Sequence, residues 1–302
     1  MGAPEAGALT EAFEAERRGL FAHAYRMLGA YHEAEDVVQD TYMRALRGWE
    51  TFERRSSVRA WLYRIATNVC LNVIDSRRRR ALSSGIGPDD LGPWLEPFPT
   101  DPVDLVTARE SVRLAFVAGL QHLAPRQRAV LLLREVLAFS AAETGDVLGM
   151  SVPAVKSALQ RARVRLAEAA PARDEVLDAS SPRARELLAA YMAAWEASDA
   201  DAFREVLRAD ATIEPIGSPP SYSAREACLA FATPAMGIPG EWRMAATESN
   251  GQPAAVAWFR GEPYGLAVLT VAEDGIVAIT LFGNPKLAEI FEGSAWRAGN
   301  AG

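Results

Sequence analysis

The sequence predicts a multi-domain chain in which two all-α segments precede a C-terminal α+β domain. The chain has 302 residues, more than a single hydrophobic core usually organises. Apolar residues recur at helical spacing through residues 11–80 and 105–170. After residue 183 a helical stretch gives way to short β-rich runs, and this order is typical of an α+β domain.

Composition excludes several classes of protein. Charged residues make up 24% of the chain and hydrophobic residues 49%, which is typical of globular proteins and not of disordered chains or collagens. The sequence has no apolar run long enough for a transmembrane helix, and its acidic N-terminus lacks the features of a signal peptide. The two cysteines and three histidines are scattered, which argues against disulfides and metal sites. We therefore expect a cytoplasmic protein without a metal or a cofactor.

Charge is unevenly distributed along the chain. The net charge is −7, but residues 1–170 carry 22 basic and 21 acidic side chains, whereas residues 171–302 carry 10 and 18. Residues 54–80 contain eight arginines and one acid, and residues 31–40 contain four acids and no base. Such segregation predicts different partners on different faces of the molecule.

The first helical segment, residues 11–80, combines an acidic helix with a basic one. The acidic helix has an apolar face between Val37 and Trp49, and its acids lie near its N-terminus, where they interact favourably with the helix dipole. The basic helix starts near Val58, and its arginines lie beside aromatic side chains, a combination that suits phosphates and unstacked bases. A polar stripe at positions i, i+4, i+8 and i+11 follows its apolar face: Arg64, Asn68, Asn72 and Asp75.

The second helical segment, residues 105–170, ends in a helix-turn-helix pattern. Pro125 opens one helix, and Ser140 with Glu143 forms a capping box that opens the next. A turn at Gly149 leads to the last helix, which would lie in a DNA major groove. The side chains expected at base edges are Lys156, Ser157 and Gln160, and those expected at phosphates are Arg161, Arg163 and Arg165.

Two segments rich in proline and polar residues are expected to be linkers, residues 81–104 and 171–182. The first contains Trp94, Leu95 and Phe98, which we expect to dock on a folded surface because solvated linkers seldom expose aromatic side chains. Residues 183–295 form the expected α+β domain. Its strand candidates are Ala211–Ile216, Ala254–Arg260, Leu266–Ala272 and Ile276–Phe282, with a hairpin turn at Asp274-Gly275 between the last two.

Three stretches resemble a known protein family in their amino-acid sequence and in their order along the chain. They read AEDVVQDTY at residues 34–42, VRAWLYRIATN at 58–68 and LGMSVPAVKS at 148–157. Over roughly residues 13–170 the chain resembles the extracytoplasmic-function (ECF) group of bacterial RNA polymerase sigma factors. Family members usually have alanine where this chain has Gly145, which is expected to weaken its helix by up to about 1 kcal/mol.

The C-terminal domain resembles the cone-shaped α+β fold of SnoaL polyketide cyclase and ketosteroid isomerase. Sigma factors with such an extension form a subgroup. Residues 92–97 and 282–287 look similar to that subgroup's linker and tail motifs. The expected architecture is thus a region 2 helical bundle, a region 4 helix-turn-helix and a SnoaL-like domain.

The resemblance implies a role for each candidate site residue. Asp36, Gln39 and Asp40 would contact the β′ clamp of core RNA polymerase. Region 4 would read the −35 promoter element through the helix-turn-helix residues named above and would meet the β flap. The residues implied in binding the −10 element are Arg55, Ser56, Arg59, Trp61, Arg64, Asn68, Asp75, Arg77 and Arg78.

We therefore predict a sigma factor, not an enzyme, whose partners are core RNA polymerase and promoter DNA. The acidic C-terminal domain would regulate it by contacting the sigma domains, and an anti-sigma factor or a small ligand stays open as a further partner. Two alternatives remain. One is a helix-turn-helix regulator independent of polymerase. The other is a sigma factor fused to an isomerase- or cyclase-like enzyme that would draw on these residues: Asp199, Asp201, Asp210, Glu214, Tyr191, Tyr222 and Tyr264.

Overall fold

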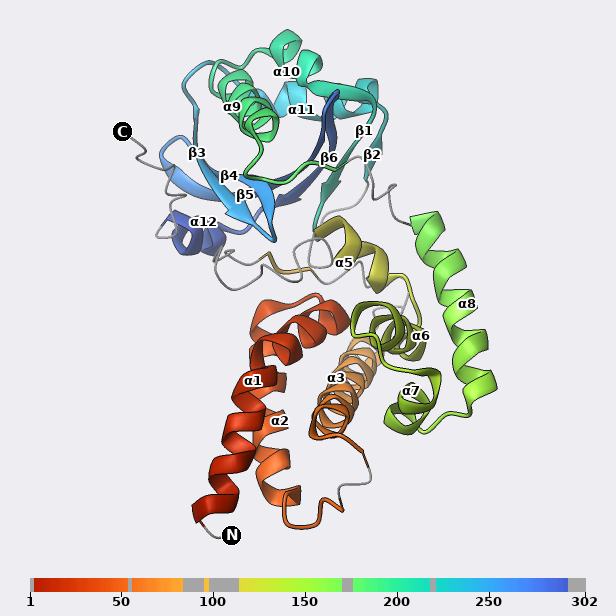
Figure 1. Cartoon of the computed structure of the whole chain (residues 1–302). Helices are drawn as coiled ribbons and strands as arrows, with labels where there is room; N and C mark the ends of the chain where they lie inside the picture. Colours follow the sequence, from red (N-terminus) through yellow and green to blue (C-terminus); the bar gives the residue numbers. More distant parts are fainter. Residues whose placement is uncertain are drawn as a thin grey trace. The chain divides into compact units, whose positions relative to one another are not determined.

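The computed structural model of the chain (Figure 1) describes residues 3–53, 56–83, 95–97, 114–169, 176–217 and 221–292. The chain divides into two compact units, Met1–Glu96 with Ala115–Pro171, and Pro97–Leu114 with Ala172–Gly302. The architecture predicted from the sequence, helical domains followed by an α+β domain, is confirmed. No helix in the described ranges has the length and apolarity needed to cross a membrane.

Every regular element described in the first unit is a helix. A three-helix bundle comes first, and the helix-turn-helix closes the unit. The elements are α1 (Ala3–Leu28), α2 (Tyr31–Gly48), α3 (Val58–Ser83), the greater part of α5 (Leu114–Gln121), α6 (Pro125–Leu131), the π-helix η1 (Leu132–Val136), α7 (Ala141–Leu148) and α8 (Val152–Ala169).

Buried polar side chains connect α1 to α3 inside the bundle. His23 on α1 is fully buried, and its Nε2 lies 2.9 Å from Thr67 Oγ1 on α3. The Thr67 hydroxyl donates in turn to the Tyr63 carbonyl at 2.6 Å. Burial, reinforced by the charge of Arg26, lowers the pKa of His23 from 6.5 to about 3. The imidazole is therefore neutral in the folded protein at pH 7.

Arg128 joins the helix-turn-helix to the bundle. It lies on α6, is only 5% exposed, and donates to the Met27 carbonyl at the end of α1. The same guanidinium donates to Gln121 Oε1 at 2.6 Å and to the Leu123 carbonyl at 3.3 Å. Both terminal nitrogens of the guanidinium are bonded, although its Nε is buried without a partner in the described part of the chain. Because a buried charge depends on such compensating bonds, the contact holds α6 at a defined place against α1.

Local signals in the sequence define the helix-turn-helix as expected. Pro125 occupies the first turn of α6, and both hydrogen bonds of the Ser140–Glu143 capping box are present. Gly149 ends α7 with φ +64°, a left-handed conformation that favours glycine. Gly145 has a tertiary role that the sequence did not show, because a Cβ at this position would lie 2.6 Å from the Met150 carbonyl oxygen.

The second unit is a six-stranded sheet with helices packed on it (Figure 1). The strand order is β2-β1-β6-β5-β4-β3, and β1 pairs with β6 in parallel while all other neighbours are antiparallel. The elements are α9 (Pro182–Glu196), α10 (Ala200–Val206), β1 (Leu207–Pro215), β2 (Tyr222–Ser223), α11 (Arg225–Met236), β3 (Trp242–Ser249), β4 (Gln252–Phe259), β5 (Glu262–Ala272), β6 (Gly275–Phe282) and α12 (Pro285–Glu292).

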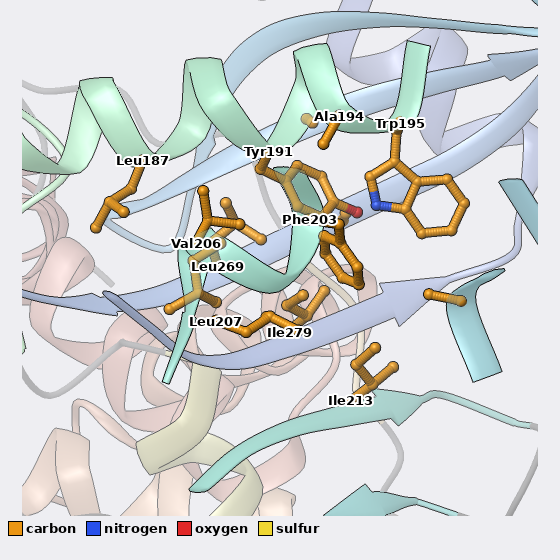
Figure 2. Close-up of a cluster of buried hydrophobic side chains, with 14 of the residues drawn as sticks. Leu187, Tyr191, Ala194, Trp195, Phe203, Val206, Leu207, Ile213, Leu269 and Ile279 are labelled. Carbon is orange, nitrogen blue, oxygen red and sulfur yellow. The ribbon is translucent and has the colours of Figure 1, made fainter. Parts of the chain in front are cut away.

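The core of this unit lies between the sheet and the helices α9, α10 and α11 (Figure 2). Large side chains come from α9 and α10, including Tyr191, Trp195 and Phe203. The strands face them with smaller residues such as Leu269 and Ile279. Aromatic rings on the helices thus fill the space that alanine and branched side chains leave on the sheet.

The predicted strands and the hairpin are confirmed, with shifted ends. Gly275 pairs with Ala272, so the turn lies where the Asp274-Gly275 signal predicted it. The prediction omitted β2, β3, α11 and α12. Strand β3 is half-exposed over much of its length and has little of the β-branched composition that marks a strand, so it gave no clear signal.

Most residues of the two predicted linkers lie outside the described residues, and Trp94 and Phe98 are among them. Helix α3 extends to Ser83, past the predicted start of the first linker. The described Leu95 is 5% exposed, which confirms docking for this residue. Next to it, the Glu96 backbone accepts from the Tyr25 hydroxyl at 2.9 Å and donates to the Gly29 carbonyl at 2.8 Å.

His23 makes stability dependent on pH in a defined window. Its folded-state pKa of about 3 lies below its ordinary value of 6.5, so on acidification the unfolded chain takes up a proton before the folded protein does. The free energy of unfolding is expected to fall between these two values by up to about 1.4 kcal/mol per pH unit from this group. Urea unfolding at a series of pH values should show that H23Q loses this component, while H122Q, at an exposed histidine, keeps it. An identical pH dependence in H23Q and the parent protein would contradict the assignment.

Gly145→Ala is expected to destabilise the protein by roughly 1–3 kcal/mol, because the added methyl group would collide with a backbone oxygen. Helix propensity alone predicts a gain of about 1 kcal/mol, so the two effects have opposite signs. Gly7 is a matched control, since it is also helical and a Cβ added there would meet nothing within 4 Å. Chemical unfolding of G145A and G7A shows whether the steric collision or the helix propensity dominates at residue 145. Stabilisation of the protein by G145A would refute the steric argument.

Candidate nucleic-acid interface

Helix α8 presents the predicted base-reading residues on its outer face. Its inner face buries Val155, Ala158 and Ala162, and α8 packs on α6. Lys156, Ser157 and Gln160 are all exposed. Because they lie at i, i+1 and i+4, they share one side of the helix, as the sequence predicted.

The three arginines that follow on α8 are exposed but differ in their surroundings. Arg163 is paired with Glu135 of η1, with 2.8 Å between Nε and Oε1. Arg161 donates to the Ser157 hydroxyl at 2.6 Å. Arg165 makes no ion pair or hydrogen bond in the described part of the chain, so its charge is directly available to a phosphate.

A cluster of three aromatic rings lies where α2 leads into α3. Phe52 stacks on Trp61 with 4.6 Å between ring centroids, and Trp49 lies 5.9 Å from Trp61. Phe52 and Trp61 border a cavity of about 890 Å³ that Ser56 and Arg64 also line. Trp61 is only half-buried. A face of the cluster is therefore accessible to a flat ligand.

The opposite wall of this cavity comes from the first helix of the helix-turn-helix. Glu143, Asp146 and Val147 of α7 line it. The carboxylates of Glu143 and Asp146 thus line the same cavity as Arg64 and Trp61. Nucleic acid would meet these acids unless α7 moves away, because phosphates and carboxylates repel each other.

The polar stripe on α3 is exposed as predicted. Arg64, Asn68 and Asp75 are all exposed, and Arg78 extends the row. A second cavity, of about 430 Å³, is lined by Asn68, Asp75 and Arg78 together with Pro125 at the start of α6. The stripe therefore follows the α3 surface continuously from the aromatic cluster towards the C-terminal end of the helix.

Two of the arginines predicted to contact DNA, Arg59 and Arg77, make hydrogen bonds to other segments of the first unit. The Arg59 guanidinium lies 4.7 Å from the Phe139 ring centroid and donates to the Leu137 carbonyl at 3.2 Å. Arg77 donates to Glu33 Oε1 at 3.0 Å, and its side chain is 18% exposed. Both guanidinium groups thus have partners within the fold, and their contact with DNA stays a prediction. Arg55 lies outside the described residues.

Helix α2 carries the predicted polymerase-facing residues on its exposed side. Asp36 and Gln39 are exposed, while Asp40 is half-exposed and pairs with Arg44 at 2.9 Å. Met43 lies one turn beyond Gln39 and is 47% exposed. Met43 was not among the residues predicted to contact polymerase, although its i+7 spacing from Asp36 places it on the same face.

Two of the four acids considered for enzymatic chemistry in the second unit, Asp199 and Asp210, are engaged in local contacts. Asp199 caps α10 by accepting from the backbone N–H groups of Asp201 and Ala202 at 3.0 and 2.9 Å. Asp210 pairs with Arg208, which lowers the pKa of its carboxyl. Within the described ranges no group of three or more His, Cys, Asp or Glu side chains could hold a metal ion.

Comparison with known proteins gives two family matches and several relatives. Sigma-70 region 2 matches residues 12–80, and Sigma-70 region 4 matches residues 113–166. The chain is 44% identical over 297 residues to the ECF RNA polymerase sigma factor SigG of Mycobacterium tuberculosis, an alignment that covers 89% of this chain and 79% of that protein.

The fold is similar over nearly the whole chain to a solved structure, the extracytoplasmic function sigma factor SigJ of Mycobacterium tuberculosis. The TM-score is 0.65 at 25% identity, and the match covers 93% of this chain and 99% of that one. In sequence, SigJ of the same organism is 32% identical over 204 residues, which covers 66% of this chain and 62% of SigJ.

Arg59→Ala is expected to destabilise the first unit by about 1–2 kcal/mol, because it removes a hydrogen bond to a backbone carbonyl and a cation–π contact. Arg78→Ala, at an exposed arginine on the same helix, should change stability by less than about 0.5 kcal/mol. Denaturant unfolding of both variants measures the difference. Equal effects would show that Arg59 does not hold the helices together.

Proposed function

The chain belongs to the extracytoplasmic-function sigma factors of the sigma-70 family, and on this premise we propose how its surfaces divide the work of promoter recognition. It binds core RNA polymerase and directs transcription initiation at specific promoters, and its C-terminal α+β domain is the SnoaL-like extension of this group. The observation that carries the proposal is that one compact unit displays an acidic helix face, a polar stripe and a helix-turn-helix. We retain region 2 at residues 11–80, region 4 at 105–170 and the C-terminal domain at 183–295.

The exposed face of α2 is proposed to bind the β′ clamp. Asp36 and Gln39 supply polar contacts there, and Met43 adds an apolar side chain. A hydrophobic side chain among polar ones is typical of a protein interface, where the centre is dry and the rim is polar. No nucleic acid would be attracted to this face, because its acids repel phosphates.

The −10 element is proposed to be read by α3 and the aromatic cluster. Trp61 offers a stacking surface for an unpaired base, and Ser56 and Arg64 border the cavity beside it. Asn68 and Asp75 continue along the helix, with Arg78 at a phosphate. Arg59 and Arg77 also act as positioning residues for α3, through their bonds to the Leu137 carbonyl and to Glu33.

The −35 element is proposed to be read by α8. Lys156 and Gln160 have the donors and acceptors needed to distinguish base edges in the major groove, with Ser157 between them. Arg161, Arg163 and Arg165 lie further along the helix, where they would contact phosphates. The β flap of polymerase would hold region 4 over this element.

The C-terminal domain is proposed to regulate transcription and not to catalyse a reaction. Two of its candidate general bases are engaged, Asp199 in a helix cap and Asp210 in an ion pair, which weakens the enzyme alternative. Its sequence has a net charge of −8 over residues 171–302, which suits contact with basic surfaces of the sigma domains.

Gln160→Ala and Arg165→Ala are expected to separate base reading from phosphate binding. Loss of Gln160 should reduce discrimination at one or two positions of the −35 element by about 10- to 100-fold. Loss of Arg165 should weaken binding to all DNA sequences alike. It should also lower the slope of log affinity against log salt concentration by about one, because one fewer counterion is released on binding. Selection from a library with a randomised −35 element, repeated at several salt concentrations, measures both. A changed base preference in R165A would contradict the assignment.

Binding to purified core polymerase and run-off transcription on genomic promoter fragments test the function itself. The full chain should bind core and give specific transcripts, whereas M43E should bind core at least about tenfold more weakly, because it places a charge in the interface. I238E is the control, since Ile238 is also exposed but lies in the C-terminal unit. Tight promoter binding without core binding would favour the polymerase-independent regulator.

The same assay with residues 1–172 tests regulation by the C-terminal domain. A higher yield of transcripts than from the full chain would mean inhibition by the domain, and a lower yield would mean activation. Equal activity of both forms on every promoter tested would contradict a regulatory role.

A further inference from the structure

Two apolar side chains are exposed at the start of α8, the second helix of the helix-turn-helix. Val152 is the first residue of α8 and is 38% exposed, and Pro153 follows it and is also exposed. Six large apolar side chains are exposed in the described part of the chain, and two of them, Val152 and Val164, belong to α8. A single exposed apolar residue is ordinary, so the place of the pair on the helix decides what it means.

The pair adjoins the residues proposed to read bases. Val152 lies four residues before Lys156, and Pro153 lies four before Ser157 and seven before Gln160. Residues at these spacings share one side of a helix. The second helix of a helix-turn-helix enters the major groove with its N-terminal residues at the base edges. Val152 and Pro153 therefore occupy the end of α8 that comes nearest to the bases.

The first turn of α8 holds these side chains in a fixed position. The Ser151 carbonyl accepts from the Val155 N–H at 2.9 Å, and the Ser151 hydroxyl accepts from the Ala154 N–H at 3.4 Å. Val155 is fully buried on the inner face. A valine in a helix has one strongly preferred χ1 rotamer, so Val152 loses little conformational freedom when another group packs against it.

Neither member of the pair can read a base through a hydrogen bond. The Val152 side chain is a hydrocarbon, and Pro153 lacks even the backbone N–H that could donate to a phosphate. The contact that they offer is apolar. Among the base edges of the major groove, the group that suits such a contact is the 5-methyl group of thymine. The chemistry of the pair therefore favours thymine over the other three bases.

Lys156 gives the expected position of this thymine. Its side chain is exposed and makes no hydrogen bond or ion pair in the described part of the chain, and lysine commonly binds the O6 and N7 atoms of guanine. Val152 and Lys156 are about 6 Å apart along the helix axis, and successive base pairs are about 3.4 Å apart. The thymine should therefore lie within about two base pairs of the guanine that Lys156 binds.

We propose that Val152 and Pro153 make an apolar contact with the 5-methyl group of a thymine in the −35 element, beside a guanine bound by Lys156. This inference rests on the proposed function, because it requires α8 to read the −35 element in the major groove. It adds one base to the sequence that the helix recognises and makes Val152 a specificity-determining residue.

Replacement of thymine by uracil tests the contact directly, because it removes the methyl group and keeps the base pairing. The holoenzyme is assembled from core polymerase and the full chain, and its preferred −35 element is selected from a promoter library. Each thymine of that element, on either strand, is then replaced singly by uracil, and the affinity of the holoenzyme is measured. One replacement beside a guanine should weaken binding about three- to fivefold, the effect of leaving one methyl group unburied.

Val152→Ala removes the protein side of the contact. Alanine is favourable at an exposed helical position, so the variant should fold. In V152A the same uracil replacement should change the affinity by less than about 1.5-fold, because the thymine methyl group has already lost its partner. V164A is the matched control, since Val164 is also an exposed valine on α8 but lies about 18 Å further along the helix. It should keep the full effect of uracil.

Three results would overturn the inference and leave the proposed function intact. They are a selected element without a thymine within about two base pairs of a guanine, a uracil effect that persists in V152A, and an equal loss of the effect in V164A. Weaker binding of V152A to core polymerase, with no effect of uracil, would assign the apolar pair to a protein interface and would also refute the contact with DNA. A holoenzyme that selects no −35 sequence at all would contradict the proposed reading of this element by α8, and the inference with it.

Discussion

Arg128 carries a positive charge into the interior of the first unit, and the oxygens that receive its hydrogen bonds come from separate segments of the chain. One is the carbonyl of Met27 at the end of α1, and others belong to Gln121 and Leu123 before α6. Burial and the charge of Arg77 lower the pKa of Arg128 to about 10, so the guanidinium stays charged at pH 7. Because a buried charge needs its partners in place, α6 is held against α1, and the helix-turn-helix packed on α6 is held with it.

The arginines of the first unit fall into two groups, according to whether or not their guanidinium groups bond to other parts of the fold. Arg59, Arg77 and Arg128 hold helices together through carbonyls, a carboxylate and aromatic rings. Arg64 and Arg165 are exposed and offer their charge to the surroundings. A count of arginines therefore overstates the charge available to nucleic acid. Those that organise the interior act on recognition indirectly, by setting the position of α3 and α8.

The C-terminal unit uses its polar side chains differently. Asp199 caps α10 and Asp210 pairs with Arg208, while buried polar side chains such as Gln252 and Thr270 bond to each other in its interior.

Features encoded by neighbouring residues could be predicted from the sequence alone. Helical periodicity, the Ser140–Glu143 capping box, the glycine turn at Gly149 and the hairpin before β6 depend on contacts within a few residues, and all are present. The exposed face of α8 follows from the same periodicity. The weakly patterned strand β3 gave no such signal and was missed.

Only the tertiary structure decided which side chains are free to act. Arg77 meets Glu33, which is 44 residues away in sequence, and Arg59 donates to the Leu137 carbonyl, which is 78 residues away. Local pattern determines which face a residue occupies, whereas its availability depends on partners that only folding brings within reach.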